Sequence, residues 1–494
     1  MRIRIVSTFP GKHTVQVVSK RYGKVIIHKH IGTFANESEK QVLLKKADTF
    51  IKKQTGQDGL FDLPFGFKLT DIAITDSKPL FVYRLLSAMY DKLGFSKYGD
   101  PLIRDLVIAR IYSPTSKRET REILEDFFNC EYSLKTIYRH LKKSLDHGLK
   151  DSFQKALISF ARNDLGDNLR LVFYDVTTLY FDSQARQGLK DFGFSKDRHA
   201  TDTQIVVGLV VNKEGFPLYF DIFNGRTFEG HTFIAVVQNI RKLLNNPELV
   251  IIADAAMISR NNIEKLVGKN IGFIVGARLA NLPIYLQEEI SHRLAKEDEK
   301  VITASYRNQK LVCQYLSKRA AKDRHDREKQ IGRAQKALLS PSGVTSRFRF
   351  LKTDGKKYLL NEKLIAKAEA LEGIKGYVTN TKLDENTVID RYHDLWRIEN
   401  AFRLTKSDLE ARPIFHRLDE TITCHLVTVF AGLAICRYLE IKTGMSIHKI
   451  LKLAGKVLTH KVTNSQTKEA AYIETTIENH DLKKKIELLK SLGH

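Results

Sequence analysis

The chain has 494 residues, enough for about three domains of ordinary size. Hydrophobic residues make up 43% of it, a share that excludes a disordered chain and indicates packed cores. Lys and Arg number 81 against 57 Asp and Glu, which gives a formal net charge of +24. Such an excess favours a polyanionic partner, because neutralised phosphates release their counterions. Nucleic acid is the expected partner, although a merely soluble basic protein has the same balance.

The four cysteines lie far apart and form no CxxC pair: Cys130, Cys313, Cys424 and Cys436. This spacing argues against a zinc site or a disulfide framework and fits a reducing cytoplasm. The N-terminus lacks the unbroken apolar core of a signal peptide. The best apolar run, Leu426 to Ile435, is too short to span a bilayer and predicts a buried helix. We therefore expect a cytoplasmic protein with no membrane partner.

Residues 1–35 alternate apolar and polar side chains around a Tyr-Gly turn, a pattern typical of short β-strands. Residues 36–165 instead carry apolar residues at spacings of three and four, which predicts amphipathic helices. Two helix starts are marked by capping residues: Ser116, with Glu119 three positions later, and Ser133. We predict a small β region over 1–35 and a helical DNA-binding region over 36–165.

The helix that begins after Ser133 has the sequence LKTIYRHLKKSL and resembles the second helix of a helix-turn-helix. Its basic residues would then face phosphates: Lys135, Arg139, Lys142 and Lys143. An ordinary amphipathic helix with a solvated basic face would show the same pattern. Both interpretations stay open at this point.

From Leu169 onwards the pattern changes to three β-rich runs, then a helix, a short apolar strand, a second helix and another strand. This order is that of a ribonuclease H-like core with a mixed sheet. The run Gly-Tyr-Val-Thr-Asn at 376–380 resumes the core. One long helix is expected to follow it, from about Asp384 to Ala411.

Two spans do not continue this pattern. Residues 279–374 hold short strand-like pieces and a charged stretch, which we interpret as a β-rich insertion. Residues 446–494 are expected to form a C-terminal helical region. The predicted fold class is therefore α/β: a ribonuclease H-like mixed-sheet core over 166–278 and 375–445, interrupted by the insertion.

Two aspartates stand at positions where a carboxylate is unusual. Asp175 lies in the first β-rich core run, and such a group is costly to bury unless it has a partner or a metal. Asp254 ends the apolar run Val250–Ala253, and the carboxyl ends of strands in α/β sheets form the active crevice. Taken alone, each aspartate also fits a structural role, capping a turn or a helix.

Glu399 lies on the expected long helix, where Tyr392, Glu399 and Lys406 are seven residues apart and fall on nearly one face. Arg403 follows four residues after Glu399, a spacing that suits an ion pair. The structural alternative is a buried amphipathic helix with a Glu–Arg pair at its edge.

Three carboxylates together suggest a site for two divalent ions. Mg²⁺ or Mn²⁺ prefers oxygen ligands, retains waters and binds substrate phosphate. Two such ions activate a water or a 3′-hydroxyl and stabilise the leaving oxygen of an in-line displacement. On this hypothesis Asp175 contacts both ions, Asp254 contacts one and Glu399 contacts the other.

These motifs resemble those of the DDE transposases of bacterial insertion sequences, and most closely the IS-four superfamily, which carries a β-rich insertion between the second Asp and the Glu. The resemblance covers roughly residues 80–440. It rests on the three acids, Tyr-Asp-Val-Thr-Thr at 174–178, the segment 193–233 and the strand 376–380.

The third motif of that family is Tyr, two residues, Arg, three residues, Glu, six residues, Lys. Tyr392, Glu399 and Lys406 match this spacing. Leu395 stands at the Arg position, and Arg391 and Arg397 are the nearby candidates to replace it.

The resemblance implies cut-and-paste transposition: Mg²⁺- or Mn²⁺-dependent cleavage of DNA at terminal inverted repeats, then strand transfer into target DNA. The implied partners are double-stranded DNA with terminal inverted repeats, target DNA and a second copy of the chain, in a nucleoid-associated protein of a bacterium or archaeon. The residues then expected to contact DNA are Tyr392, Arg397, Arg403, Lys406, Lys135, Arg139, Lys142 and, in the insertion, Lys318, Arg319, Lys322 and Arg324. A solvated charged helix is the alternative for the insertion residues.

Two other functions fit part of the sequence. A ribonuclease H-like nuclease that only hydrolyses would use the same acids, but the long insertion and Lys406 argue against it. A catalytically silent DNA-binding regulator derived from a transposase would use the basic helix at 133–145 equally well. Such a regulator would keep its effect in an Asp175→Ala variant, whereas an enzyme would lose cleavage.

Overall fold

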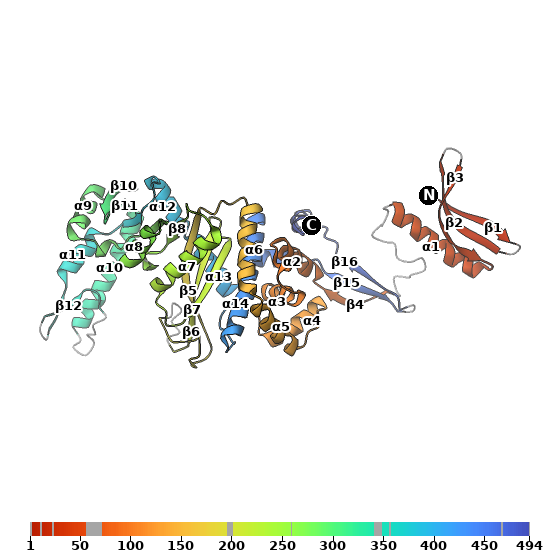
Figure 1. The fold of residues 1–494 in the computed structure, drawn as a ribbon, viewed down its shortest axis with the longest axis horizontal. Helices are drawn as coiled ribbons and strands as arrows, with labels where there is room; N and C mark the ends of the chain where they lie inside the picture. The colour runs from red at the N-terminus through yellow and green to blue at the C-terminus, as the bar shows by residue number, and fades with distance from the viewer. Residues whose placement is uncertain are drawn as a thin grey trace. The chain divides into compact units, whose positions relative to one another are not determined.

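The computed structural model describes residues 2–9, 12–21, 24–55, 72–194, 201–257, 259–339, 348–354, 357–465 and 468–493. The chain divides into two compact units, Met1–Ser77 with Thr459–Glu474, and Lys78–Leu458 with Thr475–His494. Figure 1 labels their elements. Residues 195–200 of the motif segment 193–233 lie outside the described part of the chain.

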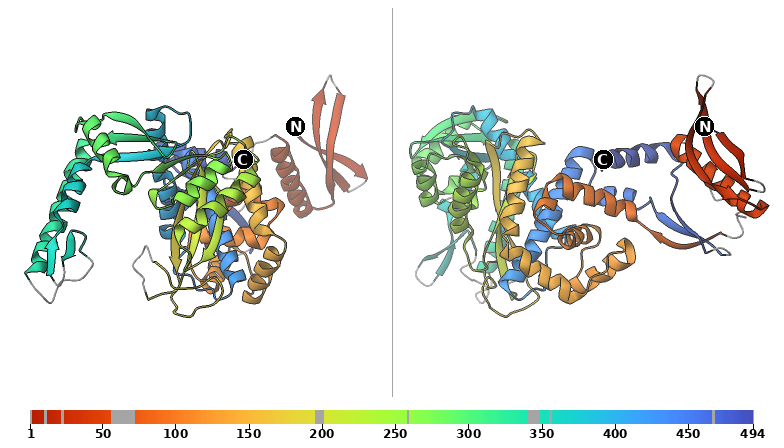
Figure 2. Two further views of the ribbon diagram at one scale, coloured as in Figure 1. Left: turned by 60° about the vertical axis from the view of Figure 1, so that its left-hand side comes forward. Right: turned by 45° about the vertical axis from the view of Figure 1, so that its right-hand side comes forward.

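The first unit begins with an antiparallel meander of three strands, β1 (Arg2–Phe9), β2 (Lys12–Arg21) and β3 (Lys24–Phe34). Helix α1 (Glu37–Thr55) lies along this sheet, as Figure 2 shows, and a small core of Val15, Val17, Phe34 and Ala47 joins them. The sequence boundary at residue 35 would have grouped α1 with the helical region. Instead its apolar side packs on β2 and β3.

A second sheet of the first unit has the order β16-β15-β4, from β4 (Ile72–Lys78), β15 (Thr459–Asn464) and β16 (Ala470–Glu474). The sequence had predicted a helical region over 446–494, and this prediction was wrong in part. Besides α15 (Ile447–Ala454) and α16 (His480–Leu492) the region contains this hairpin. β-Branched residues Thr459, Val462 and Thr463 explain the strand, because they favour a pleated surface over a helix.

The second unit opens with a bundle of helices: α2 (Leu80–Lys92), α3 (Pro101–Tyr112), α4 (Lys117–Phe128), α5 (Leu134–Asp146) and α6 (Leu149–Asn163). Both helix starts expected from capping residues are confirmed. The Ser116 hydroxyl accepts from the Glu119 backbone N–H at 3.3 Å, and the Ser133 hydroxyl accepts from the Thr136 N–H at 3.1 Å.

Helix α14 (Asp419–Thr443) runs through the interior of the same unit and packs on α2, α3, α5 and α6. It is long and apolar enough to cross a membrane by length and composition alone, but 94% of its most apolar window is buried within the protein. The buried helix predicted at Leu426 to Ile435 is therefore confirmed as the central part of α14.

A mixed eight-stranded sheet follows, in the order β10-β11-β14-β9-β8-β5-β6-β7. Its central elements appear in the predicted order: β5 (Leu171–Tyr180), β6 (Gln204–Asn212), β7 (Pro217–Asn224), α7 (Glu229–Leu244), β8 (Val250–Ala253), α8 (Arg260–Gly268) and β9 (Gly272–Gly276). Strands β5, β6 and β7 pair antiparallel, whereas β5, β8 and β9 pair parallel. The expectation of an α/β protein with a mixed sheet is confirmed.

The span predicted as a β-rich insertion contributes to this same sheet. Strands β10 and β11 extend it through β14 instead of forming a separate sheet. The rest is mostly helical, with α10 alongside the β12–β13 hairpin, as Figure 2 also shows. Its elements are α9 (Ile284–Leu294), β10 (Val301–Tyr306), β11 (Gln309–Tyr315), α10 (Ser317–Leu338), β12 (Leu351–Asp354), β13 (Lys357–Leu360) and α11 (Glu362–Ala370), followed by β14 (Ile374–Thr379).

The long helix expected from Asp384 to Ala411 is in fact two helices, α12 (Glu385–His393) and α13 (Trp396–Ser407). At the break the backbone hydrogen bonds tighten to a three-residue spacing, for example from the Leu395 N–H to the Tyr392 carbonyl at 3.1 Å. Asp394, at the break, also forms ion pairs with Arg391 at 3.6 Å and Arg397 at 3.1 Å. The apolar spacing alone did not reveal this break.

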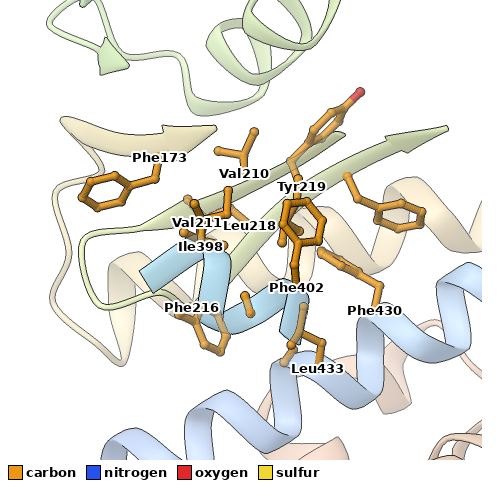
Figure 3. Close-up of a cluster of buried hydrophobic side chains, with 14 of the residues drawn as sticks. Phe173, Val210, Val211, Phe216, Leu218, Tyr219, Ile398, Phe402, Phe430 and Leu433 are labelled. Carbon is orange, nitrogen blue, oxygen red and sulfur yellow. The ribbon is translucent and has the colours of Figure 1, made fainter. Parts of the chain in front are cut away.

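The two faces of the sheet are covered by different helices. On one face the Tyr174 hydroxyl meets the Thr232 hydroxyl of α7 at 2.6 Å, and its ring lies 5.4 Å from that of Phe233. On the other face, helices α13 and α14 pack against the sheet. Figure 3 shows the buried side chains that gather there, among them Phe173, Leu218, Ile398, Phe402, Phe430 and Leu433. Because side chains alternate along a strand, Asp175 shares the face of Phe173 and so points toward the α13 side.

Candidate active site

Asp175 and Asp254 are neighbours because of the register between two parallel strands. Strand β5 pairs with β8 so that Tyr174 lies opposite Ala253. Each aspartate is the next residue along its chain, and adjacent strands are about 4.8 Å apart. Each carboxylate also accepts a hydrogen bond of 2.7 Å from the backbone N–H that follows it, of Val176 and of Ala255. The fold therefore brings the two predicted aspartates together at the carboxyl ends of β5 and β8.

Glu399 comes to the same place from a different element. It lies in the first turn of α13, and this helix packs against β5 and β6 through its buried residues Ile398 and Phe402. Glu399 follows Ile398 in the sequence and is exposed to solvent. The apolar side of the helix thus fixes where this carboxylate stands.

All three acids line one cavity of about 570 Å³, which we call the carboxylate cavity. The other side chains on its wall come from β9, α10, β14 and the α12–α13 segment, and include Arg319, Lys375, Tyr392, Leu395 and Trp396. Residues separated by more than two hundred positions in the sequence therefore meet around one space. This juxtaposition was expected from the sequence for the three acids and for Tyr392.

Tyr392 holds one of the carboxylates by a direct contact. Its hydroxyl donates to Asp254 Oδ1 at 3.1 Å, and burial together with the Asp254 charge raises the pKa of this phenol. Gly276 makes room for the contact, because a Cβ at that position would lie 2.5 Å from the Tyr392 hydroxyl oxygen. The glycine at this position of β9 is thus explained by the close approach of the Tyr392 side chain to the strand backbone, and not by a turn.

Two cations balance the acids. The Lys375 ammonium lies over the rings of Tyr377 and Tyr392, at 5.6 and 5.1 Å. Burial and the nearby Arg319 lower the pKa of Lys375, while Asp254 and Glu399 act in the opposite direction. Arg319 itself pairs with Asp323 at 3.4 Å. The cavity therefore combines carboxylates with cations suited to phosphate oxygens.

The donor set fits hard divalent cations. Mg²⁺ is commonly held by one or two carboxylates together with waters and substrate phosphate, and all three acids here offer oxygen ligands toward one space. Within the described part of the chain, no three His, Cys, Asp or Glu side chains are close enough to hold one ion together.

The structure does not bring the other predicted residues of the third motif to this cavity. Arg397 pairs with Asp394 and lies against the Trp396 ring at 5.0 Å. Arg403 donates to Asn400 Oδ1 at 3.1 Å and pairs with Asp408 at 3.7 Å, so the ion pair considered with Glu399 is not formed. Lys406 is half-buried near the end of α13, outside the cavity wall.

Leu395, which stands where the third motif of the resembling superfamily has Arg, is buried and lines the cavity. Neither Arg391 nor Arg397 takes its place there, because both pair with Asp394. Two other cationic side chains line the cavity instead, Arg319 of the insertion and Lys375 of β14. Sequence spacing had assigned Arg319 only to a basic helix surface and had not singled out Lys375. The sequence signal that could have indicated Lys375 was its position in the core strand β14, two residues before Tyr377.

The remaining predicted contacts are exposed on two helices. On α5, Lys135, Arg139, Lys142 and Lys143 all face solvent, with Lys142 3.8 Å from Glu420. On α10, Lys318, Lys322 and Arg324 are exposed as well. Arg324 lies 3.6 Å from Glu372, so the carboxylate partly neutralises its charge within the protein.

Comparison with known proteins identifies the family. Residues 168–435 match the model described as "Transposase DDE domain", and this span contains all three acids. No curated protein sequence matches the chain. Among solved structures, the chain is similar to a piggyBac transposase in a synaptic complex with hairpin DNA, at 8% identity and a TM-score of 0.41, over 77% of this chain and 79% of that chain.

Two structures of Mos1 transposase are also similar. A pre-cleavage Mos1 transpososome shares 12% identity at a TM-score of 0.16, over 32% of this chain and 72% of that chain. A Mos1 paired-end complex with the left transposon end gives the same identity and TM-score, over 48% and 71%. At such TM-scores the structural likeness carries no weight, and the assignment rests on the sequence match. Because this match spans more than half of the residues, the chain belongs to the family of proteins with a transposase DDE domain.

Proposed function

We propose that this chain is a transposase that cleaves DNA at terminal inverted repeats and transfers the freed strand into target DNA. The observation that carries the proposal is the meeting of Asp175, Asp254 and Glu399 on one cavity that also holds cations. Membership of the DDE-domain family supports the same conclusion. Within the family we place the chain nearest to the IS-four superfamily, with a ribonuclease H-like core, on the strand order and the Tyr392–Glu399–Lys406 spacing.

Asp175, Asp254 and Glu399 would hold two Mg²⁺ or Mn²⁺ ions. When bound, such ions supply an activated water or 3′-hydroxyl and stabilise the leaving oxygen of an in-line displacement at phosphorus. Carboxylates suit this role because they remain charged at neutral pH and offer several oxygen atoms.

The protein side chains around the acids have separate tasks. Lys375 and Arg319 face the same space as the acids and would bind the non-bridging oxygens of the scissile phosphate. The Tyr392 hydroxyl holds Asp254 Oδ1 in one orientation. The buried face of α13 fixes the position of Glu399. Placement of these groups before the substrate arrives reduces the reorganisation needed during the reaction.

Binding of DNA is assigned to the exposed basic residues of α5 and α10. Lys135, Arg139 and Lys142 on α5, with Lys318 and Lys322 on α10, would contact backbone phosphates. We extend this assignment to Arg397, Arg403 and Lys406 on α13. Two copies of the chain would act on a pair of transposon ends. The net charge of +24 supports such an extended polyanionic partner.

The test is Mg²⁺-dependent cleavage of DNA that carries the inverted repeats flanking the coding sequence, with the wild type beside Asp254→Ala. We expect the wild type to nick at the repeat boundary and to join strands, while the variant binds the same DNA and does not cut.

Two results would replace the proposal. If both proteins bind and neither cuts with Mg²⁺ or Mn²⁺, the chain is a DNA-binding regulator and the acids have structural roles. If the wild type cuts but forms no joined product with target DNA, it is a nuclease that only hydrolyses.

A further inference from the structure

A second cavity in the same unit has the opposite charge. It encloses about 520 Å³ between α3, α4, α5 and the segment that leads into α14, and shares no lining residue with the carboxylate cavity. Its charged wall residues are four cations and two acids: Arg110, Lys117, Arg118, Arg412, Glu119 and Glu410. We call this space the cationic cavity.

Lys117 is the unusual member of this group. Only 5% of the residue is exposed, and it lines the cavity. Its ammonium makes no hydrogen bond or ion pair with the described residues, and it is not among the side-chain atoms that are both fully buried and unpartnered. A buried charge without a partner is costly, since desolvation is not repaid by attraction. Burial and the neighbouring Arg110 accordingly lower the pKa of Lys117 to about 7. An uncompensated buried cation on a cavity wall indicates that its counter-charge comes from a ligand.

The groups around Lys117 do not supply that counter-charge. Burial lowers the pKa of His416 to about 4 and that of His425 well below its ordinary range, with Lys117 and Arg110 adding to the effect, so both rings are neutral. The Nε2 of His425 faces the Ala411 carbonyl at 3.1 Å, and its buried Nδ1 has no partner among the described residues. The two acids, Glu119 and Glu410, are exposed to solvent.

The backbone at this place adds to the positive potential. Helix α4 begins at Lys117 and has twelve residues, and the N-cap Ser116 also lines the cavity. A helix N-terminus carries about half a positive charge and unpaired N–H groups, which favour a phosphate. Arg110 donates to the Thr115 carbonyl at 2.9 Å, which fixes the loop before α4.

The candidate DNA-binding helix α5 forms part of the cavity wall. Leu134 and Tyr138 of α5 form part of the wall, and Arg139, the next residue, is exposed. Tyr138 is 42% exposed, and Phe415, which also lines the cavity, is 67% exposed. Such aromatic rings suit contact with sugars or bases, which a free phosphate ion lacks.

We propose that the cationic cavity binds a phosphate group of the DNA backbone, with Lys117, Arg118 and the N-terminus of α4 as its ligands, and so fixes the position of α5 on the duplex. This inference rests on the proposed function, since it requires that the chain binds DNA. In helix-turn-helix proteins the first helix crosses the backbone while the second enters the groove, and α4 and α5 stand in that order. The clamped phosphate would neutralise the buried ammonium of Lys117.

The test uses Lys117→Met, with Lys155→Met as a matched control on an exposed position of α6. Both changes are made in an Asp254→Asn background, so that binding is measured without cleavage. The probe is a short duplex of the flanking inverted repeat, titrated over a range of salt concentrations. We expect Lys117→Met to weaken binding by about tenfold or more and to reduce the slope of log K against log salt by about one, because one phosphate contact is lost. The control is expected to match its parent protein.

A second measurement assigns the contact to one phosphate. Neutral methylphosphonate linkages are placed one at a time along the duplex, and each is tested with parent and Lys117→Met. We expect one position to weaken binding of the parent and to have no further effect on the variant, as coupled partners require. Arg118→Gln, an exposed side chain whose loss does not threaten folding, is expected to lower the salt slope as well.

The outcomes separate this inference from the function on which it rests. If the parent binds no DNA, the proposed function is wrong, and so is the inference that the cationic cavity binds a backbone phosphate (the phosphate clamp). If the parent binds and both Lys117→Met and Arg118→Gln keep its affinity and slope, only the clamp is wrong. If inorganic phosphate raises the Tm of the parent but not of Lys117→Met, and the DNA measurements do not change, the cavity binds a free phosphate and the DNA assignment is overturned.

Discussion

The carboxylate cavity and the cationic cavity have similar volumes, about 570 and 520 Å³, but opposite relations between charge and burial. In the first, Asp254 and Glu399 are exposed and Asp175 is half-buried, and the protein itself supplies the balancing cations Lys375 and Arg319. In the second, Lys117 is almost fully buried and no acid in the described part of the chain pairs with it. One site is nearly balanced within the protein, and the other is not.

This difference separates two ways of building a site for phosphates. Exposed carboxylates cost little to keep charged, so the acids of the carboxylate cavity need no bound ligand to offset a desolvation penalty. A buried ammonium costs folding free energy until an anion reaches it. The cationic cavity should therefore affect stability and binding, whereas the carboxylate cavity should affect chemistry.

The strongest test of the comparison removes one carboxylate from the first cavity. We expect Glu399→Gln to lower the rate of DNA cleavage by at least about a thousandfold, because a metal ligand contributes several kcal/mol to the transition state. The thermal midpoint should change little, since Glu399 is exposed. The measurement is single-turnover cleavage with saturating Mg²⁺.

Glu487→Gln is the matched control, an exposed glutamate on α16 away from both cavities. It should cleave at the wild-type rate. If Glu399→Gln retained cleavage within tenfold of this control, Glu399 would not be a metal ligand, and the predicted catalytic set would be reduced to the two aspartates.

The carboxylate cavity was largely predictable from sequence because its acids stand at recognisable places. Asp254 ends a short apolar strand, and Asp175 lies in a strand whose neighbours are apolar. Once β5 and β8 are expected to pair in parallel, the two aspartates at their carboxyl ends are expected to lie side by side. The break between α12 and α13 was not predictable, because the apolar spacing continues through it while the backbone hydrogen bonds change.

The cationic cavity could not be predicted in the same way. Its wall combines residues 110–138 with residues 410–425, and only the packing of α14 against α3 and α5 brings them together. In the sequence, Lys117 follows a helix cap and looks like an ordinary exposed lysine in a first helical turn. Its burial depends on a partner helix that begins about three hundred residues later in the sequence. The β15–β16 hairpin was missed for a related reason, since its strand partner β4 ends at Lys78, even further away in the sequence.

The next test measures the cost of the buried charge directly. The pKa of Lys117 is about 7 in the folded protein against an ordinary value of 10.5, so between these values the unfolded chain binds a proton that the folded chain lacks. The free energy of unfolding must therefore rise with pH through this window, and the destabilisation is fully present only below pH 7.

We expect wild type to gain about 2–3 kcal/mol between pH 7 and pH 9 relative to Lys117→Met, at about 1.4 kcal/mol per unit. The measurement is denaturant unfolding of both proteins in phosphate-free buffer, so that other titrating groups cancel in the difference. Parallel curves for the two proteins would mean that Lys117 is hydrated or paired, and that the contrast between the cavities is weaker than the geometry indicates.

A third test concerns the internal balance of the carboxylate cavity. Lys375→Met removes the cation that faces Asp254 and Glu399, and we expect cleavage to slow about a hundredfold because phosphate oxygens lose a donor. The concentration of Mg²⁺ needed for half-maximal rate should fall at the same time, since the carboxylates no longer share their charge with an ammonium.

Lys382→Met, an exposed lysine just after β14, is the control and should alter neither quantity. A slower rate with an unchanged Mg²⁺ requirement would leave Lys375 as a phosphate contact but contradict the charge balance on which the comparison depends. No change in rate would remove Lys375 from the site altogether.

The smallest expected effect separates orientation from charge. Tyr392→Phe deletes the hydroxyl that donates to Asp254 Oδ1 but keeps the ring beside Tyr377, and we expect cleavage to slow about tenfold, the value of one hydrogen bond to a charged group. Tyr377→Phe loses a hydroxyl that meets His393 Nε2 at 3.2 Å and no acid, so its effect should stay below about twofold. Gly276→Ala should reproduce the defect of Tyr392→Phe, because the added methyl would lie 2.5 Å from the same hydroxyl oxygen and displace it from Asp254. Equal losses in both tyrosine variants would show that the ring stack, and not the contact with Asp254, is what the reaction requires.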